Sequence, residues 1–178
     1  MSSGTQRDGD HPTRAIFTME PRSTSHAEEL FPVLSDPHIY EFLDESPPES
    51  ITALRERLAR SESRRSPDGS EHWLNWVVRD ELGAVAGQVQ TTIFPDFTAN
   101  VAYVFASSHW GRGVAFSAVE RMLKTVRDAF VVTTFYVVLE HENHRSKRLA
   151  ERLGFKAASL EDAANKKLSA TEIMMSRS

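Results

Sequence analysis

The stretch YVFASSHWGRGVA, residues 103–115, contains the pattern that decides the fold. Its apolar start is typical of a strand, its glycines of a turn, and the residues from Val114 onward of a helix. The first amides of a helix lack partners within the helix and carry partial positive charge, so a pyrophosphate binds well there. Gly111 and Gly113 let the backbone approach a phosphate closely, and Arg112 adds charge. The stretch predicts a phosphate-binding turn, although a Gly-x-Gly turn can equally serve a purely steric purpose.

The residues that follow alternate between helix and strand. Apolar residues at helical spacing predict a helix over about 114–130. The β-branched and aromatic run 131–139 predicts a strand that is covered on both faces. A second helix is predicted over about 143–153, with Gly154 as its left-handed cap.

The other strands place this unit in a larger sheet. They are expected over 15–19, 72–79, 84–94, 99–106, 155–159 and 172–175. Short connections join the three middle ones, so these should form an antiparallel meander. The order of helices, meander and then strand–helix–strand predicts a mixed α/β sheet.

Three helices are expected before the meander. Ser25 and Glu28 have the spacing of a capping box that opens the first helix. Asp36-Pro37 opens a short second helix, and Ser50 caps a third that runs to Arg60.

Composition excludes several classes of protein. Residues 1–13 have the composition of a disordered tail, and residues 14–178 suit a single domain. The net charge of −4 gives no reason to expect nucleic-acid binding. No apolar run approaches the roughly 18 residues of a membrane span, and the start lacks the apolar core of a secretory signal, so we expect a cytoplasmic protein. Without cysteine, disulfides, a thiol nucleophile and Cys-ligated zinc are excluded, and no metal is expected.

A second segment narrows the choice of ligand. Asn143-His144-Arg145-Ser146 opens the later helix, which ends in Leu153-Gly154-Phe155. Taken singly, Asn143 can be an ordinary N-cap and Ser146 a solvent-facing helix residue.

Together the two segments resemble the GNAT superfamily of N-acetyltransferases. The family's Gln/Arg-x-x-Gly-x-Gly/Ala signature falls on Trp110, Gly113 and Ala115, with Trp110 in place of the usual Gln or Arg. The Trp-Gly-Arg-Gly-Val-Ala variant resembles the branch of ribosomal-protein alanine acetyltransferases. The later motif, Asn-x-x-Ser followed by Leu-Gly-Phe, matches at Asn143, Ser146 and the residues 153–155.

The resemblance implies a fold and a co-substrate. It implies a sheet of about six or seven strands with helices on both faces, and two parallel strands that splay apart to hold acetyl-coenzyme A. It implies backbone contacts from Val104, Phe105 and Ala106 to the pantetheine arm. The pyrophosphate would be held by the amides of Trp110, Gly111, Arg112, Gly113, Val114 and Ala115. Asn143 would hydrogen-bond the pantetheine or the region near the thioester, and Ser146 would sit close to the sulfur and protonate the leaving thiolate.

The same resemblance raises a question about the base. Many relatives carry a Glu three residues before the Tyr of the third meander strand, and here that position is Asn100, which cannot take a proton. A lysine-type amine is about 3.4 pH units too basic at pH 7, whereas an α-amine near pKa ~7.8 needs far less help. Other candidates for the base are His72, His109, Glu140 and His141. Loss of the proton to water, with positioning supplying most of the acceleration, is the alternative.

The acceptor pocket and the activity itself stay open at this point. Trp73, Trp76 or Tyr40 can line an acceptor pocket or simply pack in the core, and the two tryptophans should face opposite sides of their strand. The predicted enzyme is an acetyl-coenzyme A-dependent N-acetyltransferase, a monomer or a homodimer, acting on a peptide or protein N-terminus or a small amine. The alternative is a non-catalytic acyl-coenzyme A sensor. A nucleotide-binding domain is disfavoured because the chain contains neither Gly-x-x-x-x-Gly-Lys-Ser/Thr nor Gly-x-Gly-x-x-Gly.

Overall fold

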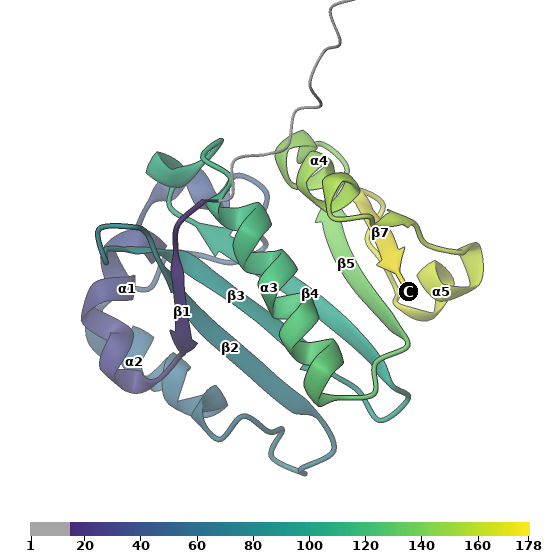
Figure 1. The fold of residues 1–178 in the computed structure, drawn as a ribbon, viewed down its shortest axis with the longest axis horizontal. Helices are drawn as coiled ribbons and strands as arrows, with labels where there is room; N and C mark the ends of the chain where they lie inside the picture. The colour runs from purple at the N-terminus through teal and green to yellow at the C-terminus, as the bar shows by residue number, and fades with distance from the viewer. Residues whose placement is uncertain (1–14) are drawn as a thin grey trace, which may run out of the picture.

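The computed structural model describes residues 15–178 as one mixed sheet with helices on both faces (Figure 1). The predicted tail, residues 1–13, lies outside the described residues. The sheet has seven strands in the order β1-β2-β3-β4-β5-β7-β6. They are β1 Thr18–Pro21, β2 His72–Arg79, β3 Val85–Ile93, β4 Thr98–Phe105, β5 Thr134–Glu140, β6 Lys156–Ala157 and β7 Glu172–Arg177. Among these strands only β4 and β5 pair in parallel. The predicted mixed α/β sheet with an antiparallel meander is confirmed.

One face of the sheet is covered by the long helix α3, Val114–Ala129 (Figure 1). Its buried stripe, which includes Val119, Met122 and Val126, packs in one cluster with Phe135 of β5. Residues three and four apart share one helix face, and the alternate residues of each strand share one sheet face, so this core follows from the two periodicities. After β5, α4 (His144–Arg152) continues the strand–helix–strand unit.

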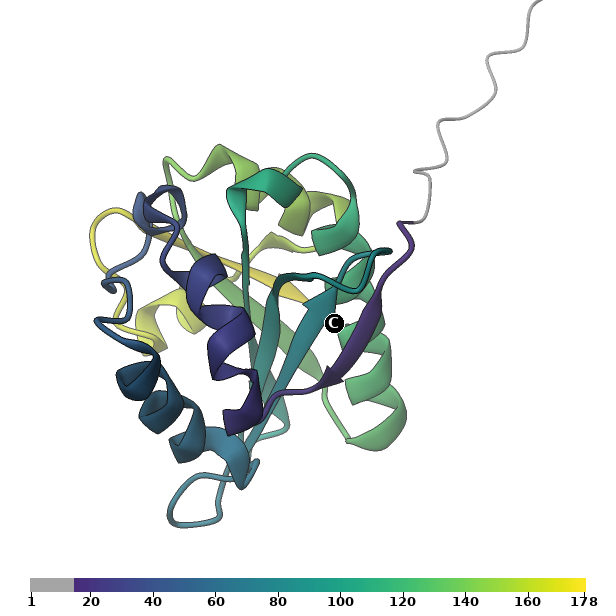
Figure 2. The same cartoon turned by 90° about the vertical axis from the view of Figure 1, so that its left-hand side faces the viewer.

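The opposite face is covered by α1, Ala27–Leu34, and α2, Ile51–Glu62, as the turned view shows (Figure 2). Leu30, Leu54 and Leu58 form a second buried cluster against Val77 of β2. Two short 3-10 helices, Thr24–His26 and Pro37–Tyr40, flank α1.

Two local predictions need correction. The capping box begins at Ser23 rather than Ser25, because a 3-10 turn precedes α1 and the Ser23 N–H donates to His26 Nδ1 (3.1 Å). Glu28 instead forms an ion pair with Arg55 of α2. The first strand is likewise shifted toward the C-terminus, since β1 starts at Thr18.

A short helix near the C-terminus was not predicted. α5, Leu160–Asn165, is capped by Ser159, whose Oγ accepts the Asp162 N–H (3.1 Å). It buries none of its residues, so it has no apolar stripe that could reveal it in the sequence.

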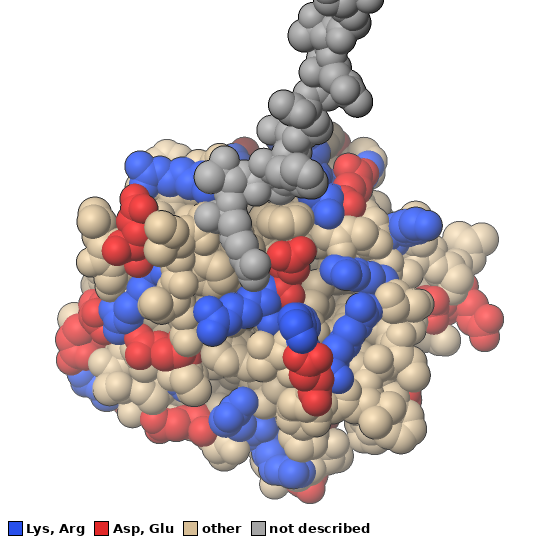
Figure 3. Space-filling model, viewed as in Figure 1, with Lys and Arg blue, Asp and Glu red and all other residues tan. Residues whose placement is uncertain are grey.

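Within residues 15–178 no helix is both long enough and apolar enough to cross a membrane. On the face that α3 covers, acidic and basic side chains are intermixed (Figure 3).

Candidate active site

The parallel strands β4 and β5 separate part of the way along their length. They pair at Thr98, Ala99 and Asn100, opposite Thr134 to Tyr136, and no pair follows. Beyond Asn100, β4 continues to pair with β3 on its other side. The β5-facing backbone edge of β4 is thus left without a strand partner over its last five residues. Such an edge can hydrogen-bond an extended ligand as an added strand.

The hydrogen bonds to β3 decide which backbone groups face this gap. The Ala106 N–H donates to Ala86 O (2.9 Å), and in an antiparallel pair every second residue is bonded in this way. Val104 lies two residues before Ala106, so its backbone N–H and C=O also point to β3. The groups that face the gap are those of Val101, Tyr103 and Phe105. Of the three residues expected to bind the pantetheine arm through backbone groups, only Phe105 presents them to the gap.

A cavity of about 380 Å³ opens beside the end of β4. It is bordered by the turn after β4, by α3 and by α4. Its charged lining residues include Arg145, Arg148 and Arg152, and no Asp or Glu lines it among the described residues. A cavity with several cations and no acid suits the phosphates of a large ligand.

The turn between β4 and α3 has the geometry that its glycines predict. Gly113 is the N-cap of α3 with φ 78° and Gly111 has φ 75°, values that favour glycine. The first bond of the helix is donated by the Ser117 N–H to Gly113 O (3.0 Å), so the amides of residues 114–116 have no acceptor in the helix. Gly111, Gly113 and Ala115 line the cavity beside these amides. The turn can bind an anion at the helix start.

Trp110, the departure from the family signature, supports this turn. Its indole Nε1 donates to Phe105 O (3.0 Å), which ties the turn to the end of β4. The guanidinium carbon of Arg145 lies 3.4 Å from the centre of the Trp110 ring, so the two side chains stack. Trp110 therefore positions Arg145 at the cavity and hydrogen-bonds the Phe105 carbonyl. A Gln or Arg at this position would itself offer polar side-chain atoms to a ligand.

Asn143 and Ser146 meet at the start of α4, as expected. Asn143 Oδ1 accepts the Ser146 N–H (3.0 Å), so the N-cap role that the sequence left open is present. Both residues line the cavity. The amide oxygen of Asn143 is engaged by the helix, which leaves its Nδ2 as the group that can donate to a ligand.

Tyr103 is the residue that the sequence did not single out. Its hydroxyl lies 2.8 Å from Ser146 Oγ and 3.3 Å from Ser146 O. Burial raises the pKa of Tyr103 to about 12, although the hydrogen bond with Ser146 acts in the opposite direction. The phenol therefore keeps its proton and can donate it to Ser146, whose own hydroxyl proton is then available to the cavity. Its position seven residues before Trp110 carried no signal of this contact.

A second cavity, of about 250 Å³, lies on the α1/α2 side of β4. Asn100, Val101 and Ala102 line it, while the next three residues of β4 line the first cavity. Asn100 is at the last paired position between β4 and β5, and its buried Oδ1 has no hydrogen-bond partner among the residues described. The two cavities therefore follow one another along β4, with Asn100 close to where the strands separate.

The four alternative bases lie away from Asn100. His72 packs edge-on against Phe130 (4.8 Å between ring centres), and burial lowers its pKa. His109 lines the first cavity, where its Nε2 lies 3.0 Å from Asp80 Oδ2. Glu140 and His141 lie at the end of β5. None of the four lines the second cavity.

The three aromatic candidates for an acceptor pocket lie in different parts of the structure. Trp73 lines the second cavity, whereas Trp76 is buried in the core on the α3 side. The two tryptophans thus face opposite sides, as predicted. Tyr40 packs near α1 and donates to Leu34 O (2.6 Å), and it lines neither cavity.

The fold is that of an acetyltransferase domain, and two cavities follow one another along its strand β4. The family model for the Acetyltransferase (GNAT) domain matches residues 17–156. The chain belongs to this family. A search of the curated proteins finds no match.

Solved structures give the same fold at low identity. Spermidine N-acetyltransferase from Vibrio cholerae, in complex with CoA and spermine, is 19% identical with a TM-score of 0.71, covering 90% of this chain and 94% of that chain. The microcin C7 self-immunity acetyltransferase, in complex with acetyl-CoA and AMP, is 18% identical with a TM-score of 0.74, covering 90% and 91%. The ribosomal alpha-N-protein acetyltransferase RimL, in complex with coenzyme A, is 15% identical with a TM-score of 0.73, covering 90% and 93%.

Proposed function

We propose that this protein transfers the acetyl group of acetyl-coenzyme A to a primary amine by direct attack in a ternary complex. The observation that carries the proposal is the succession of the two cavities along β4, one cationic and one polar, which adjoin where β4 and β5 separate. Solved structures of the same fold that hold CoA together with an amine or a nucleotide support it. RimL and the resemblance to its branch favour a peptide or protein N-terminus as the acceptor.

The co-substrate would lie along the first cavity. Its pyrophosphate would accept hydrogen bonds from the amides of residues 110–115, with Arg112 and Arg145 adding charge. The pantetheine arm would pair with the backbone of Val101 and Tyr103, and Asn143 Nδ2 would donate to it. This arrangement directs the thioester toward Asn100.

The chemistry needs one bond formed and one broken. The neutral amine nitrogen attacks the thioester carbon, the new C–N bond forms, and the C–S bond breaks to release the thiolate of coenzyme A. Ser146 would donate its hydroxyl proton to that sulfur, and the hydrogen bond from the Tyr103 hydroxyl to Ser146 Oγ would stabilise the serine oxygen until water returns the proton. The proton of the amine would leave to water, because no carboxylate or histidine lines the second cavity within residues 15–178.

Release of free coenzyme A tests the proposal. The full chain is mixed with acetyl-coenzyme A and a panel of amines, and thiol release is followed together with the mass of the acceptor. Release that requires the amine, with a gain of one acetyl group on it, is the expected result. Binding of acetyl-coenzyme A without release for any amine would instead favour a non-catalytic acyl-coenzyme A sensor. The absence of a carboxylate at position 100, which is Asn100, is consistent with that alternative.

A further inference from the structure

Arg22 is a partly buried cation that has no carboxylate partner. It follows β1 directly, and its backbone N–H donates to Asn75 O (2.9 Å). Its Nη1 donates to Gln88 Oε1 (2.7 Å) and its Nη2 to Ser61 Oγ (2.8 Å), both neutral groups. No acidic side chain of residues 15–178 forms an ion pair with it.

A charge withdrawn from water without a counter-ion is costly. Burial, with a smaller contribution from the charge of Arg57, lowers the pKa of Arg22 to about 10. The guanidinium is therefore still charged at neutral pH, in an environment that supplies no negative charge. This combination favours an anionic ligand.

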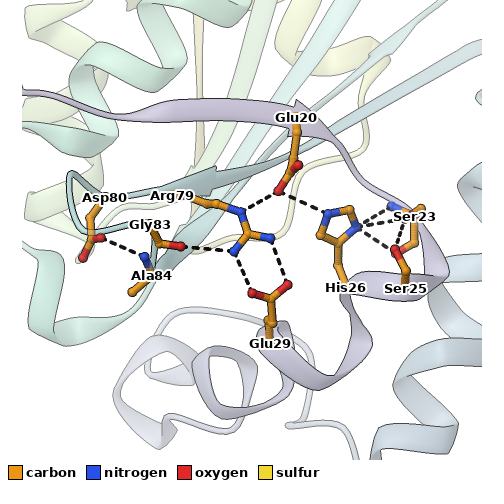
Figure 4. Close-up of polar contacts among 9 residues, drawn as sticks. All are labelled: Glu20, Ser23, Ser25, His26, Glu29, Arg79, Asp80, Gly83 and Ala84. Carbon is orange, nitrogen blue, oxygen red and sulfur yellow. Dashed lines mark hydrogen bonds and ion pairs between the residues drawn. The ribbon is translucent and has the colours of Figure 1, made fainter.

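Arg79, at the end of the neighbouring strand β2, shows the opposite arrangement (Figure 4). Its Nε lies 2.5 Å from Glu20 Oε1, and its Nη1 and Nη2 lie 2.7 and 2.9 Å from the two oxygens of Glu29. This arginine joins β1, β2 and α1 and is fully compensated. Arg79 is thus paired with two carboxylates, whereas Arg22 is paired with none among residues 15–178.

The uncompensated arginine faces a cavity with an unused acceptor. Arg22 and Asn100 both line the second cavity, and the buried Oδ1 of Asn100 has no partner. No Asp, Glu, Lys or His is among its lining residues within the described chain. The other polar lining residues are Ser61, Asn75, Gln90, Thr91 and Thr92. A ligand with an N–H at one position and a negative charge at another would satisfy both groups.

We propose that the amine acceptor carries a carboxylate or a comparable anion, which binds Arg22, while its amine donates a hydrogen bond to Asn100 Oδ1. The proposal rests on the acetyl transfer proposed above and names the class of acceptor for it. Purely cationic acceptors such as polyamines are disfavoured, because their second positive charge would approach Arg22 with no acid to offset the repulsion.

The strand register sets the distance between the two groups. Gln88, the partner of Arg22, pairs with Val104, whereas Asn100 pairs with Thr92. Four residue steps along β3 therefore separate the two ends, roughly 13 Å along the strand at ~3.3 Å per residue. An α-amino acid, with both groups on one carbon, is too short. A tripeptide, which extends over about 10 Å, has its α-amine and terminal carboxylate at a suitable separation.

Matched tripeptides test the proposal, since they differ in one group only. We compare kcat/KM for a Gly-rich tripeptide with a free C-terminus and for the same tripeptide as the C-terminal amide. The two amines are similar in basicity because the carboxylate is remote. The full-length protein should prefer the free acid by at least tenfold, and the ratio should fall to about one in Arg22→Gln. Arg22→Lys, which keeps the charge and loses the planar fork, should retain part of the preference.

Arg60→Gln is the control, because it removes an exposed cation from α2, the helix that carries Ser61, outside both cavities. Its ratio should equal that of the unmodified protein. Thermal unfolding of each variant shows whether Arg22→Gln folds, because Arg22 also bonds Ser61 and Gln88. A purely structural role would reduce the rates for acid and amide equally.

The outcomes separate this proposal from the acetyl transfer on which it rests. Equal kcat/KM for acid and amide in the unmodified protein, or a preference for spermine, would overturn the role of Arg22 and leave acetyl transfer intact. If no amine is acetylated, calorimetry of the two tripeptides with coenzyme A present still decides: tighter binding of the acid supports the anion site, and equal binding refutes it.

Discussion

The hydroxyl of Tyr103 on β4 lies 2.8 Å from Oγ of Ser146 on α4, across the edge of the first cavity. The two residues are 43 positions apart in the chain, and their contact connects the splayed strand to the helix that faces it. A phenol whose pKa is raised to about 12 is a donor at neutral pH, so it orients the serine hydroxyl toward the cavity. The pair is suited to protonate a leaving thiolate.

Ser146→Ala should lower kcat by about 100-fold, at the lower end of general-acid effects, and change the affinity for acetyl-coenzyme A less. Tyr103→Phe should lower kcat by a smaller factor, since it removes only the orienting donor. In the double variant the two effects should not multiply, because the residues act as a unit. Steady-state kinetics and calorimetry measure the two quantities. If only the co-substrate affinity changes, Ser146 is a positioning residue.

Gly113→Val should weaken coenzyme A binding at least tenfold, about 1.4 kcal/mol. A side chain at φ 78° is strained, and its bulk would lie where the backbone must approach the pyrophosphate. Gly69→Ala is the control, because Gly69 has φ 75° with open space around it in the loop before β2. Calorimetry on both variants compares the effects. An unchanged affinity in a folded Gly113→Val protein would remove the turn from the binding site.

The pH dependence of the rate should depend on the basicity of the acceptor, because Asn100 cannot accept a proton. An amine of pKa ~10.4 is neutral in only about one molecule in 2,500 at pH 7. Its kcat/KM should therefore rise almost tenfold per pH unit, while the profile of an α-amine should level off near its own pKa of about 7.8. Asn100→Asp should flatten the first profile if the carboxylate reaches the amine through water. A bend near pH 6.5 for both acceptors would instead reveal a histidine base.

Asp36 should make the protein more stable at neutral pH than in acid. Its Oδ2 accepts the Ser107 N–H (3.0 Å) and its Oδ1 the His38 N–H (3.0 Å), and hydrogen bonds from Ser107 above all hold its pKa well below the usual range. Because the folded state has the lower pKa, this stabilisation is present above the unfolded value of about 3.9 and is lost as the pH falls below it.

Asp36→Asn should accordingly reduce the free energy of unfolding by about 1.5–3 kcal/mol at pH 7, as expected for hydrogen bonds to a charged group. The difference from the unmodified protein should shrink as the pH falls from about 4 toward 2. Urea denaturation at each pH provides the values. Asp128→Asn, which removes an exposed carboxylate paired with Lys124, is the control and should change little. A difference that is the same at pH 7 and pH 2 would contradict the role given to the charge.

Much of the fold could be predicted because its signals are local. The alternation in β2 and β3 and the 3.6-residue period of α3 each arise from neighbouring residues, and the elements formed close to where they were expected. The start of the first helix was misplaced because Ser23 and Ser25 are both acceptable caps, and the chain forms a 3-10 turn from Ser23 before α1 begins. α5 was not predicted because it has no buried apolar stripe.

The sequence by itself determined the order of the elements, the left-handed glycines of the β4–α3 turn and the cap at Asn143, since a backbone dihedral or a helix cap depends on a few adjacent residues. Only the tertiary structure decided where β4 parts from β5, which backbone groups of β4 face the gap, and that Tyr103 meets Ser146. It also left Arg22 without a carboxylate partner among the described residues and brought it to Gln88, which is 66 positions away in the chain. These features depend on strand register and on packing between distant segments, which no local pattern specifies.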